Sequence, residues 1–354
     1  MPRSCNDPEP DFRMSENPHV LITGGAGYIG SHTAKRFHRA GIQPVVVDDL
    51  RRGHRSAVQW GPLIEADAGD QAVMEQIFRQ YPIAAVIHFA AYAYVGESMR
   101  YPEMYFRNNV VCTLNLLEAM RHQGVRKIVF SSTCATYGHP RQVPIAEDHP
   151  QQPVNPYGES KLMVEKILKW YGEAHGIASV ALRYFNAAGT DPEGELGEDH
   201  APETHLIPLA LSAVLGQTGT LQIFGTDYPT ADGTAVRDYL HVTDLAEAHL
   251  DAWRYLDAGG ASGAFNLGTE KGHSVREILA AVAQVTGRVV PAQEAPRREG
   301  DPACLVADAG RAAEVLHWRP RHSSLEEIVE TAWKWKTRDT RLATRARESA
   351  PVES

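Results

Sequence analysis

The chain has 354 residues, of which 43% are hydrophobic, and its 35 basic and 44 acidic side chains give a net charge of −9. This length favours two unequal lobes over a single domain. The acidic balance argues against a surface that binds nucleic acid or an anionic membrane. No apolar run approaches the roughly 18 residues that a membrane-spanning helix requires.

Two features indicate a cytoplasmic protein with reduced thiols. Residues 1–17 contain proline and acidic side chains but lack the apolar centre of a signal peptide, which predicts a flexible N-terminal extension. The four cysteines, Cys5, Cys112, Cys134 and Cys304, lack the spacing of a metal or redox motif.

The first predicted strand, His19–Thr23, ends at a glycine-rich loop, and a helix is expected over residues 30–40. Gly24, Gly27 and Gly30 allow a tight turn, the close approach of a pyrophosphate and close packing of the helix on the sheet. The free N–H groups at the positive end of that helix attract phosphate. The loop therefore predicts a dinucleotide site, although a glycine-rich turn alone also fits a plain strand-to-helix connection.

The second predicted strand, Val45–Asp48, ends on a carboxylate that follows Gly30 by 18 residues. A carboxylate at this strand end accepts hydrogen bonds from ribose hydroxyls and repels a 2′-phosphate. We therefore expect NAD as the cofactor, and not NADP.

Further apolar runs, separated by helical stretches, occur at residues 63–66, 84–91, 127–131 and 180–185. Strands that alternate with helices predict an α/β fold of the Rossmann type, with a doubly wound parallel sheet. Ligands of such sheets bind at the carboxyl ends of the strands. The polar residues expected at these ends are Asp48, Asp67, Ser131, Ser132, Thr133 and Asn186.

Tyr157 and Lys161 are four residues apart and share one face of a helix expected to begin at Asn155–Pro156. A phenol with a pKa near 10 is a poor base at neutral pH, and a nearby ammonium favours the phenolate. Thr133, at the end of the fifth strand, can hydrogen-bond both a substrate alcohol and the phenol. These groups predict redox chemistry on an alcohol, although each alone also fits a structural role.

The pattern changes after Tyr184. An apolar helix is expected over 207–215, a helix and a strand over 243–256 and 264–267, and helices over 274–286 and 325–335. The predicted organisation is an NAD-binding domain over 18–186 to which 238–267 return, a smaller mixed α/β substrate lobe over 187–237 and 268–336, and a flexible tail over 337–354.

Arg237 and Arg298 are candidates for binding a diphosphate, because a guanidinium binds phosphate oxygens in a bidentate manner. Each of them singly also fits a surface or ion-pair arginine. The 16 histidines show no cluster of metal-binding type with carboxylates, so no metal is predicted.

With these residues in place, the chain resembles the UDP-galactose (UDP-glucose) 4-epimerases of the extended short-chain dehydrogenase/reductase superfamily between about residues 18 and 336. The segments that carry the resemblance are Thr23–His32, His88–Ala91, Val95–Ser98, Asn155–Lys161, Leu182–Asn186, Phe224–Thr230, Asp232–Tyr239 and Arg298–Asp301.

The resemblance implies a tightly held NAD that is reduced and reoxidised within one turnover, while UDP-glucose and UDP-galactose interconvert through a 4-keto intermediate. Tyr157 would accept and return the 4-hydroxyl proton. Lys161 would lower the pKa of Tyr157 and hold the nicotinamide ribose, and Thr133 occupies the position of the family's catalytic serine or threonine. A homodimer is also implied, with a UDP-sugar as substrate and neither nucleic acid nor membrane as partner.

Together, these arguments assign two sets of binding residues. The NAD site is expected to contain Gly24, Gly27, Tyr28, Ile29, Gly30, Asp48, Asp49, Asp67, Ala68, Phe89, Ala90, Ala91, Asn108, Lys161, Tyr184 and Phe185. The substrate site is expected to contain Thr133, Tyr157, Asn186, His205, Leu206, Gln222, Phe224, Arg237, Arg298, Asp301 and Leu305.

Three positions depart from the family pattern. Ala93 replaces a lysine near the nicotinamide, and His205 stands where many members have an asparagine that contacts the substrate. Leu305 falls at the position that controls access of N-acetylated sugars, and its bulk predicts poor use of them.

The same fold supports other functions. A UDP-xylose/UDP-arabinose 4-epimerase shares every catalytic residue, and residues 132–138 and 226–233 match that subgroup at least as well. This alternative, or an enzyme that acts on both kinds of sugar, therefore stays open. A nucleotide-sugar 4,6-dehydratase needs an acidic pair beside the threonine, where this chain has Cys134 and Ala135. A non-catalytic NAD-sensing protein that binds partners would be expected to lose the phenol, the ammonium or the hydroxyl, and all three are present.

Overall fold

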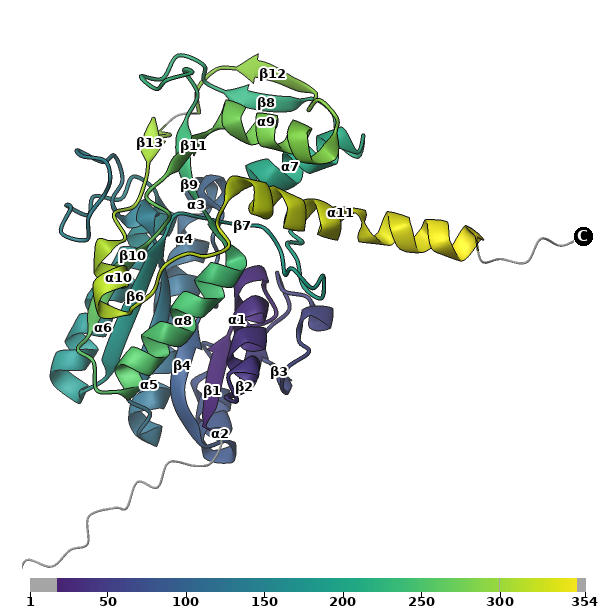
Figure 1. Cartoon of the computed structure of the whole chain (residues 1–354). Coiled ribbons are helices and arrows are strands. Elements are labelled where there is room, and N and C mark those ends of the chain that lie inside the picture. The colour runs from purple at the N-terminus through teal and green to yellow at the C-terminus, as the bar shows by residue number, and fades with distance from the viewer. Residues whose placement is uncertain (1–17, 299, 349–354) are drawn as a thin grey trace, which may run out of the picture.

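The computed structural model describes residues 18–298 and 300–348, with side chains as far as residue 338. The predicted extension 1–17 lies outside the described residues. At the centre is a parallel sheet of seven strands in the order β10-β6-β5-β4-β1-β2-β3, which confirms the predicted doubly wound fold (Figure 1). Its strands are β1 (His19–Thr23), β2 (Gln43–Asp48), β3 (Leu63–Glu65), β4 (Ile83–His88), β5 (Lys127–Thr133), β6 (Ala178–Tyr184) and β10 (Gly263–Leu267).

Helices cover both faces of this sheet, so its inner strands are apolar nearly throughout. Side chains alternate between the faces: Val20 and Ile22 pack toward α1 and α8, whereas Leu21 packs toward α2, α5 and α6. The order of β1 to β6 reverses between β1 and β4, which is where a sheet of this kind binds a dinucleotide. The covering helices are α1 (Tyr28–Arg39), α2 (Gln71–Gln80), α5 (Cys112–Gln123), α6 (Pro156–His175), α8 (Val242–Asp257) and α10 (Gly310–Val315).

Short helical segments connect these elements near the carboxyl edge of the sheet. They are η1 (Arg55–Ala57), α3 (Val95–Arg100), α4 (Pro102–Tyr105), the π-helical turn η2 (Phe106–Val111) and η3 (Cys134–Thr136). A π-helical turn inserts an extra residue into a helix and is frequent at functional sites. The η2 turn carries Asn108, one of the predicted NAD contacts.

A second lobe lies above the carboxyl edge and contains two small sheets (Figure 1). One has the order β11-β9-β13 with β7 paired to β9, and the other pairs β12 with β8. Its apolar centre is built mainly from α7, α9 and α11. The elements are β7 (Asn186–Ala188), α7 (Leu206–Val214), β8 (Leu221–Phe224), β9 (Val236–His241), β11 (Gly272–Ser274), α9 (Val275–Thr286), β12 (Ala292–Ala295), β13 (Cys304–Leu305) and α11 (Leu325–Glu348).

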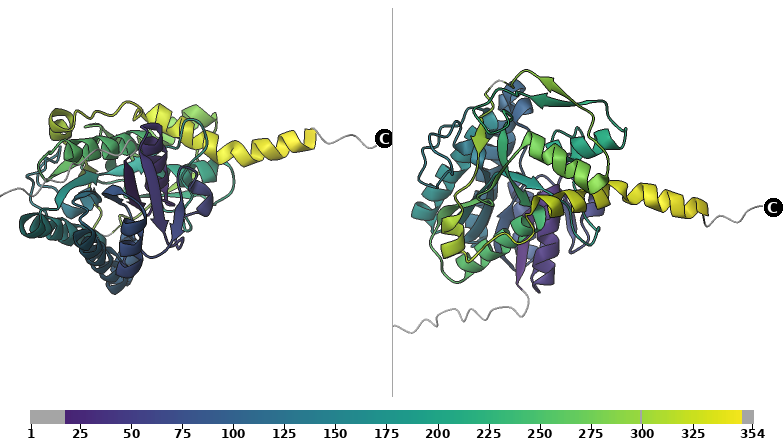
Figure 2. Two further views of the ribbon diagram at one scale, coloured as in Figure 1. Left: turned by 90° about the horizontal axis from the view of Figure 1, so that it is seen from below. Right: turned by 45° about the horizontal axis from the view of Figure 1, so that its top comes forward.

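The structure differs from the predicted boundaries at two places. Strand β9 belongs to the second lobe, so the chain returns to the large sheet at α8 and not at residue 238. Helix α11 continues to Glu348, although residues 337–354 were predicted to be a loose tail; it extends away from the body of the molecule (Figure 2). The segment 336–348 contains neither glycine nor proline, so nothing in it ends a helix. Residues 349–354 lie outside the described part.

None of the helices in the described ranges combines the length and the apolar character that crossing a membrane requires.

Candidate active site

The glycine loop between β1 and α1 has room only for glycine at two positions. Gly24 has a left-handed φ of +71°, and a Cβ there would lie 2.6 Å from the backbone nitrogen of Ala90. A Cβ on Gly30 would overlap the carbonyl oxygen of Gly24. Helix α1 follows the N-cap residue Gly27. No side chain caps its N-terminus, and its first turn carries no acidic residue. This arrangement leaves N–H groups at the start of α1 that could donate to a pyrophosphate.

Asp48 fixes the loop to the end of β2. Its carboxylate accepts hydrogen bonds from the backbone N–H groups of Ala26 at 3.0 Å and Leu50 at 2.9 Å. Burial raises the pKa of Asp48, while these two hydrogen bonds lower it. Each carboxylate oxygen keeps a further lone pair, so the group can also accept hydrogen bonds from ribose hydroxyls. The residues present therefore fit NAD.

Arg51 contacts two of the predicted NAD residues, Asp49 and Asp67. It donates to Asp49 at 2.7 Å, to Asp67 at 2.8 Å and to the hydroxyl of Tyr92 at 3.1 Å. Sequence reasoning did not identify Arg51, because its partners lie in three separate segments of the chain.

The other predicted NAD residues lie around the same strand ends. Tyr28 donates from its hydroxyl to the carbonyl of Gly189 at 2.5 Å, and the Phe89 ring centroid lies 4.6 Å from that of His249. The remaining residues on this edge are Ile29 on α1, Ala68 after β3, Ala90 and Ala91 after β4, Asn108 on η2 and Phe185 after β6.

Asn109 connects the NAD side of the site to the helix that carries Tyr157. It is buried, accepts from the backbone N–H of Tyr92 at 2.8 Å and donates to the hydroxyl of Ser160 at 3.0 Å. Its neighbour Asn108 donates to it at 3.1 Å. The sequence analysis singled out Asn108 and missed Asn109, whose partners are 17 and 51 residues away.

Tyr157 and Lys161 lie one turn apart at the start of α6, as predicted. Asn155 begins this helix by accepting a hydrogen bond from the backbone N–H of Gly158 at 2.8 Å. The Lys161 ammonium donates to the carbonyl oxygen of Ser131 at 2.8 Å, which places it at the carboxyl end of β5. The structure thus brings the phenol, the ammonium and the end of β5 together.

Burial controls the protonation of both groups. It raises the pKa of Tyr157, and so does the nearby Tyr184, whereas a hydrogen bond with Thr133 lowers it. Burial lowers the pKa of Lys161 to about 7, against the opposing effect of Glu165. The buried phenol therefore holds its proton until other charges favour the phenolate, and the ammonium holds its proton less tightly than usual.

The three hydroxyl residues that end β5 have different partners. Ser131 shares a hydrogen bond of 2.5 Å with the hydroxyl of Tyr184, and Ser132 donates to Glu165. Both therefore have the structural role that a hydroxyl at a strand end can have. Thr133 contacts Tyr157, and its hydroxyl also accepts from the backbone N–H of Ala135 at 3.2 Å. This supports Thr133 as the hydroxyl nearest the chemistry.

The predicted substrate residues in the second lobe form two contacts. Arg237 donates to Asp301 at 2.6 Å, and the Arg298 guanidinium lies 4.1 Å from the centroid of the Phe224 ring. The pairing of Arg237 leaves other guanidinium hydrogens for a phosphate. Leu305 on β13 pairs in register with Arg237 on β9.

The remaining substrate residues are placed as follows: Asn186 begins β7 opposite Tyr239 of β9, Gln222 lies on β8 opposite Gln293 of β12, His205 is the N-cap of α7 and Leu206 is its first residue.

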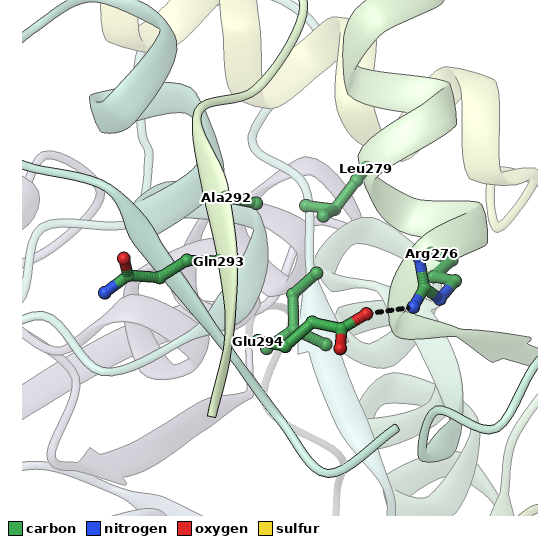
Figure 3. A pocket seen from close by; sticks show the side chains of 6 residues that line it. Arg276, Leu279, Ala292, Gln293 and Glu294 are labelled. Atoms are coloured by element: carbon green, nitrogen blue, oxygen red, sulfur yellow. Dashed lines mark hydrogen bonds and ion pairs between the residues drawn. The ribbon is translucent and has the colours of Figure 1, made fainter. Parts of the chain in front are cut away.

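A hollow of about 330 Å³ lies apart from these residues, between β8, β12 and α9. Arg276 and Glu294 form an ion pair of 2.7 Å at its wall (Figure 3). The hollow is lined by Ile223, Arg276, Leu279, Ala292, Gln293 and Glu294, none of which belongs to the predicted site. We therefore do not regard it as the active site.

The structure corrects one statement of the sequence analysis, which found no cluster of histidines with carboxylates. Glu198, His200, Glu203 and His205 come together in the segment before α7, with one ligand atom of each within 4.8 Å of the others. The signal was present as two Glu-x-His triplets, 198–200 and 203–205, which become one cluster only because the segment folds back on itself.

Comparison with known proteins agrees with this geometry. Residues 20–268 match the model of the NAD dependent epimerase/dehydratase family, and the chain belongs to this family. Its resemblance to the UDP-glucose 4-epimerases is also confirmed. The UDP-glucose 4-epimerase of Lacticaseibacillus casei is 52% identical over 317 residues, which cover 89% of this chain and 96% of that protein.

Two solved structures are similar over nearly their full length. One is a UDP-glucose 4-epimerase from Brucella ovis in complex with NAD, with a TM-score of 0.88, 51% identity, and coverage of 89% of this chain and 97% of that one. The other is a UDP-glucose 4-epimerase from Stenotrophomonas maltophila with NAD and formylated UDP-arabinopyranose, with a TM-score of 0.89, 38% identity, and coverage of 92% and 100%. NAD is accordingly the cofactor, as predicted.

We expect Gly30→Ala to lower the amount of NAD that co-purifies with the protein. The new Cβ would overlap backbone atoms of Gly24 and Gly25, and such overpacking costs about 1–3 kcal/mol. Strain of this size that opposes NAD binding lowers the affinity about 5- to 150-fold. The measurement is the NAD released per chain after acid denaturation. Gly219→Ala is the control, because nothing lies within 4 Å of a Cβ there. Equal NAD content in both variants would contradict the role of the loop.

Proposed function

We propose that the protein interconverts UDP-glucose and UDP-galactose by inverting C4 of the sugar. The observation that carries this proposal is the gathering of Thr133, Tyr157 and Lys161 at the carboxyl end of β5, on the same edge of the sheet as the glycine loop after β1. The identity of 52% with a UDP-glucose 4-epimerase supports the same activity.

The groups that hold NAD are the N–H groups of the loop from Gly24 to Gly30, the Asp48 carboxylate and the Lys161 ammonium. When bound, NAD supplies reversible oxidation of the sugar at C4. Because Gly24 and Gly30 have no side chain, the loop can pack closely against the start of α1. The free N–H groups there would bind the phosphates of NAD.

Tyr157 accepts the proton of the sugar 4-hydroxyl as the C4–O bond becomes a carbonyl, and later returns that proton. Burial keeps the phenol protonated in the resting site, so a neighbouring positive charge is needed to make it a base. Lys161 provides this charge one turn along α6 while its amine is protonated, and burial lowers the pKa of Lys161 to about 7, so this state depends on pH near neutrality. Thr133 hydrogen-bonds the phenol and is placed to hydrogen-bond the same sugar oxygen.

Arg237 and Arg298 hold the diphosphate of the substrate. A guanidinium binds phosphate through two parallel hydrogen bonds. The ketone formed at C4 therefore stays attached through its UDP group and can turn before it is reduced on the opposite face. Without this attachment, the same catalytic groups would release a ketone and act as a dehydrogenase.

The direct test is to incubate the purified protein, without added cofactor, with UDP-galactose or UDP-glucose and to follow the products by NMR. We expect the same mixture of the two C4 epimers from either direction. If the proposal is wrong, the C4 epimer of the supplied UDP-sugar will not appear. UDP-N-acetylgalactosamine is a parallel substrate, for which we expect slow or no conversion because of Leu305.

Activity on UDP-pentoses is the second candidate. The Stenotrophomonas maltophila enzyme at 38% identity was solved with formylated UDP-arabinopyranose, which is a nucleotide pentose. UDP-xylose in the same NMR experiment distinguishes the candidates, since kcat/KM for the hexose and the pentose can be compared directly.

We further propose a homodimer in the cytoplasm that acts in galactose metabolism. Exposed apolar side chains on α3, η2 and α6 support a contact between two copies of the chain through these helices. They are Val95, Met99, Val111, Met163 and Trp170. The free thiols of Cys112, Cys134 and Cys304 support a reducing compartment.

A further inference from the structure

In the cluster of Glu198, His200, Glu203 and His205, here called the His–Glu cluster, one buried carboxylate oxygen faces two imidazole nitrogens. The Glu198 side chain is only 6% exposed. Its Oε1 and the Nδ1 of His200 are both buried, and their contacts within the described residues are ion pairs that lack hydrogen-bond geometry. They face each other at 3.2 Å. Contacts of this distance without hydrogen-bond geometry favour a ligand shared between the atoms over a direct hydrogen bond.

The spacing of the four ligand atoms suits a small divalent cation. The Nδ1 of His205 lies 2.9 Å from Glu198 Oε1 and is hydrogen-bonded to Glu203 Oε1 at 2.8 Å, a contact that a bound cation would replace. The Nδ1 of His200 lies 3.2 Å from Glu198 and 3.7 Å from Glu203. Tetrahedral Zn²⁺ with bonds of about 2.0–2.1 Å places its ligand atoms about 3.3 Å apart, which lies within this range.

We propose that the His–Glu cluster binds one divalent cation, with Zn²⁺ as the metal favoured by two imidazole nitrogens and two carboxylate oxygens. The cluster lies beside the NAD loop, since the ring centroids of His200 and Tyr28 are 6.0 Å apart. His205 is the N-cap of α7, which begins with Leu206. The cation therefore fixes the segment 198–205 between the NAD loop and the start of α7. It uses only the Nδ1 of His205, which leaves Nε2 for the substrate contact expected of this residue.

The second acidic group of the chain differs from the His–Glu cluster. Asp191, Glu193 and Glu195 all pair with the ammonium of Lys35, at 2.7, 3.0 and 2.6 Å. A cation already occupies the space between these carboxylates, and it belongs to the protein. We therefore propose no metal there, and the group provides a matched control.

The test uses full-length protein purified without a metal-affinity tag, treated with a chelator and titrated with ZnCl₂, MnCl₂ or MgCl₂ by calorimetry. We expect one Zn²⁺ per chain, with a rise in melting temperature. Glu198→Gln and His200→Asn are each expected to weaken Zn²⁺ binding by at least about tenfold. Glu193→Gln should bind Zn²⁺ as the unmodified chain does.

The proposal fails if the unmodified chain binds no Zn²⁺ at a ratio of one per chain, or if Glu198→Gln binds it equally well. Either result would make the group a set of histidine–carboxylate ion pairs only. Circular dichroism of each variant shows whether it is folded, and the second variant keeps the test decisive if the first does not fold. Metal content is measured independently of activity, so its outcome is separate from that of the proposed epimerisation.

Discussion

Tyr157→Phe is expected to lower kcat for UDP-galactose conversion by about 10²–10⁴-fold, the usual contribution of a positioned proton-transfer group. The substitution removes one oxygen atom and keeps the buried ring, so the fold and the NAD content should remain. The KM should change little, because the diphosphate is held by Arg237 and Arg298 in the second lobe. Rates are measured by NMR at matched NAD occupancy.

Tyr171→Phe is the matched control, because Tyr171 lies on the same helix α6. Its hydroxyl donates to Glu118 at 2.7 Å, away from the end of β5. We expect this variant to keep the kcat of the unmodified protein. An unchanged kcat in Tyr157→Phe would remove the phenol from the mechanism.

Arg183→Met is expected to lower the free energy of unfolding by about 3–5 kcal/mol, because it leaves a buried charge without its partner. Arg183 and Glu165 have side chains that are 7% and 9% exposed, and they meet at 2.6 Å. Arg183 also donates to the hydroxyl of Tyr137 at 2.9 Å. Methionine fills similar space but supplies none of these hydrogen bonds.

The free energy of unfolding is obtained from urea denaturation followed by circular dichroism. Lys127→Met is the control, since Lys127 and Asp257 also form a 2.7 Å ion pair that joins a strand of the large sheet to a helix. Their side chains are 31% and 28% exposed, so the loss expected there is about 0–1 kcal/mol. Similar losses in the two variants would show that burial does not set the strength of the Arg183 pair.

The large sheet could be predicted from the sequence because each strand is a short apolar run of its own. The run Val45–Asp48 lies within β2, and the glycine loop identifies the end of β1. The predicted end of α11 was wrong. The segment beyond Trp335 is polar and lacks an apolar stripe, which hides a helix from the sequence pattern, but it contains good helix formers. Strand β9 was assigned to the wrong lobe because sheet membership depends on distant partners, β7, β11 and β13.

The catalytic pair was predictable because its geometry is local: four residues on a helix fix the relation of Tyr157 to Lys161. The network around Asn109 and Arg51 was not, since its members lie in distant segments and have no sequence pattern of their own. The His–Glu cluster could be predicted only in part. Its triplets are visible in the sequence, but their convergence depends on the path of the segment before α7.

The register between β13 and β9 has a consequence for how this enzyme could change its substrate range. Leu305, expected to limit the size of the sugar, sits directly opposite Arg237, expected to grip the diphosphate. Any shift of β13 that makes room for a larger sugar also displaces the strand beside Arg237. A movement of β13 is therefore expected to change both the selectivity for the sugar and the affinity for the diphosphate. A change confined to the side chain, such as Leu305→Ala, alters the selectivity alone.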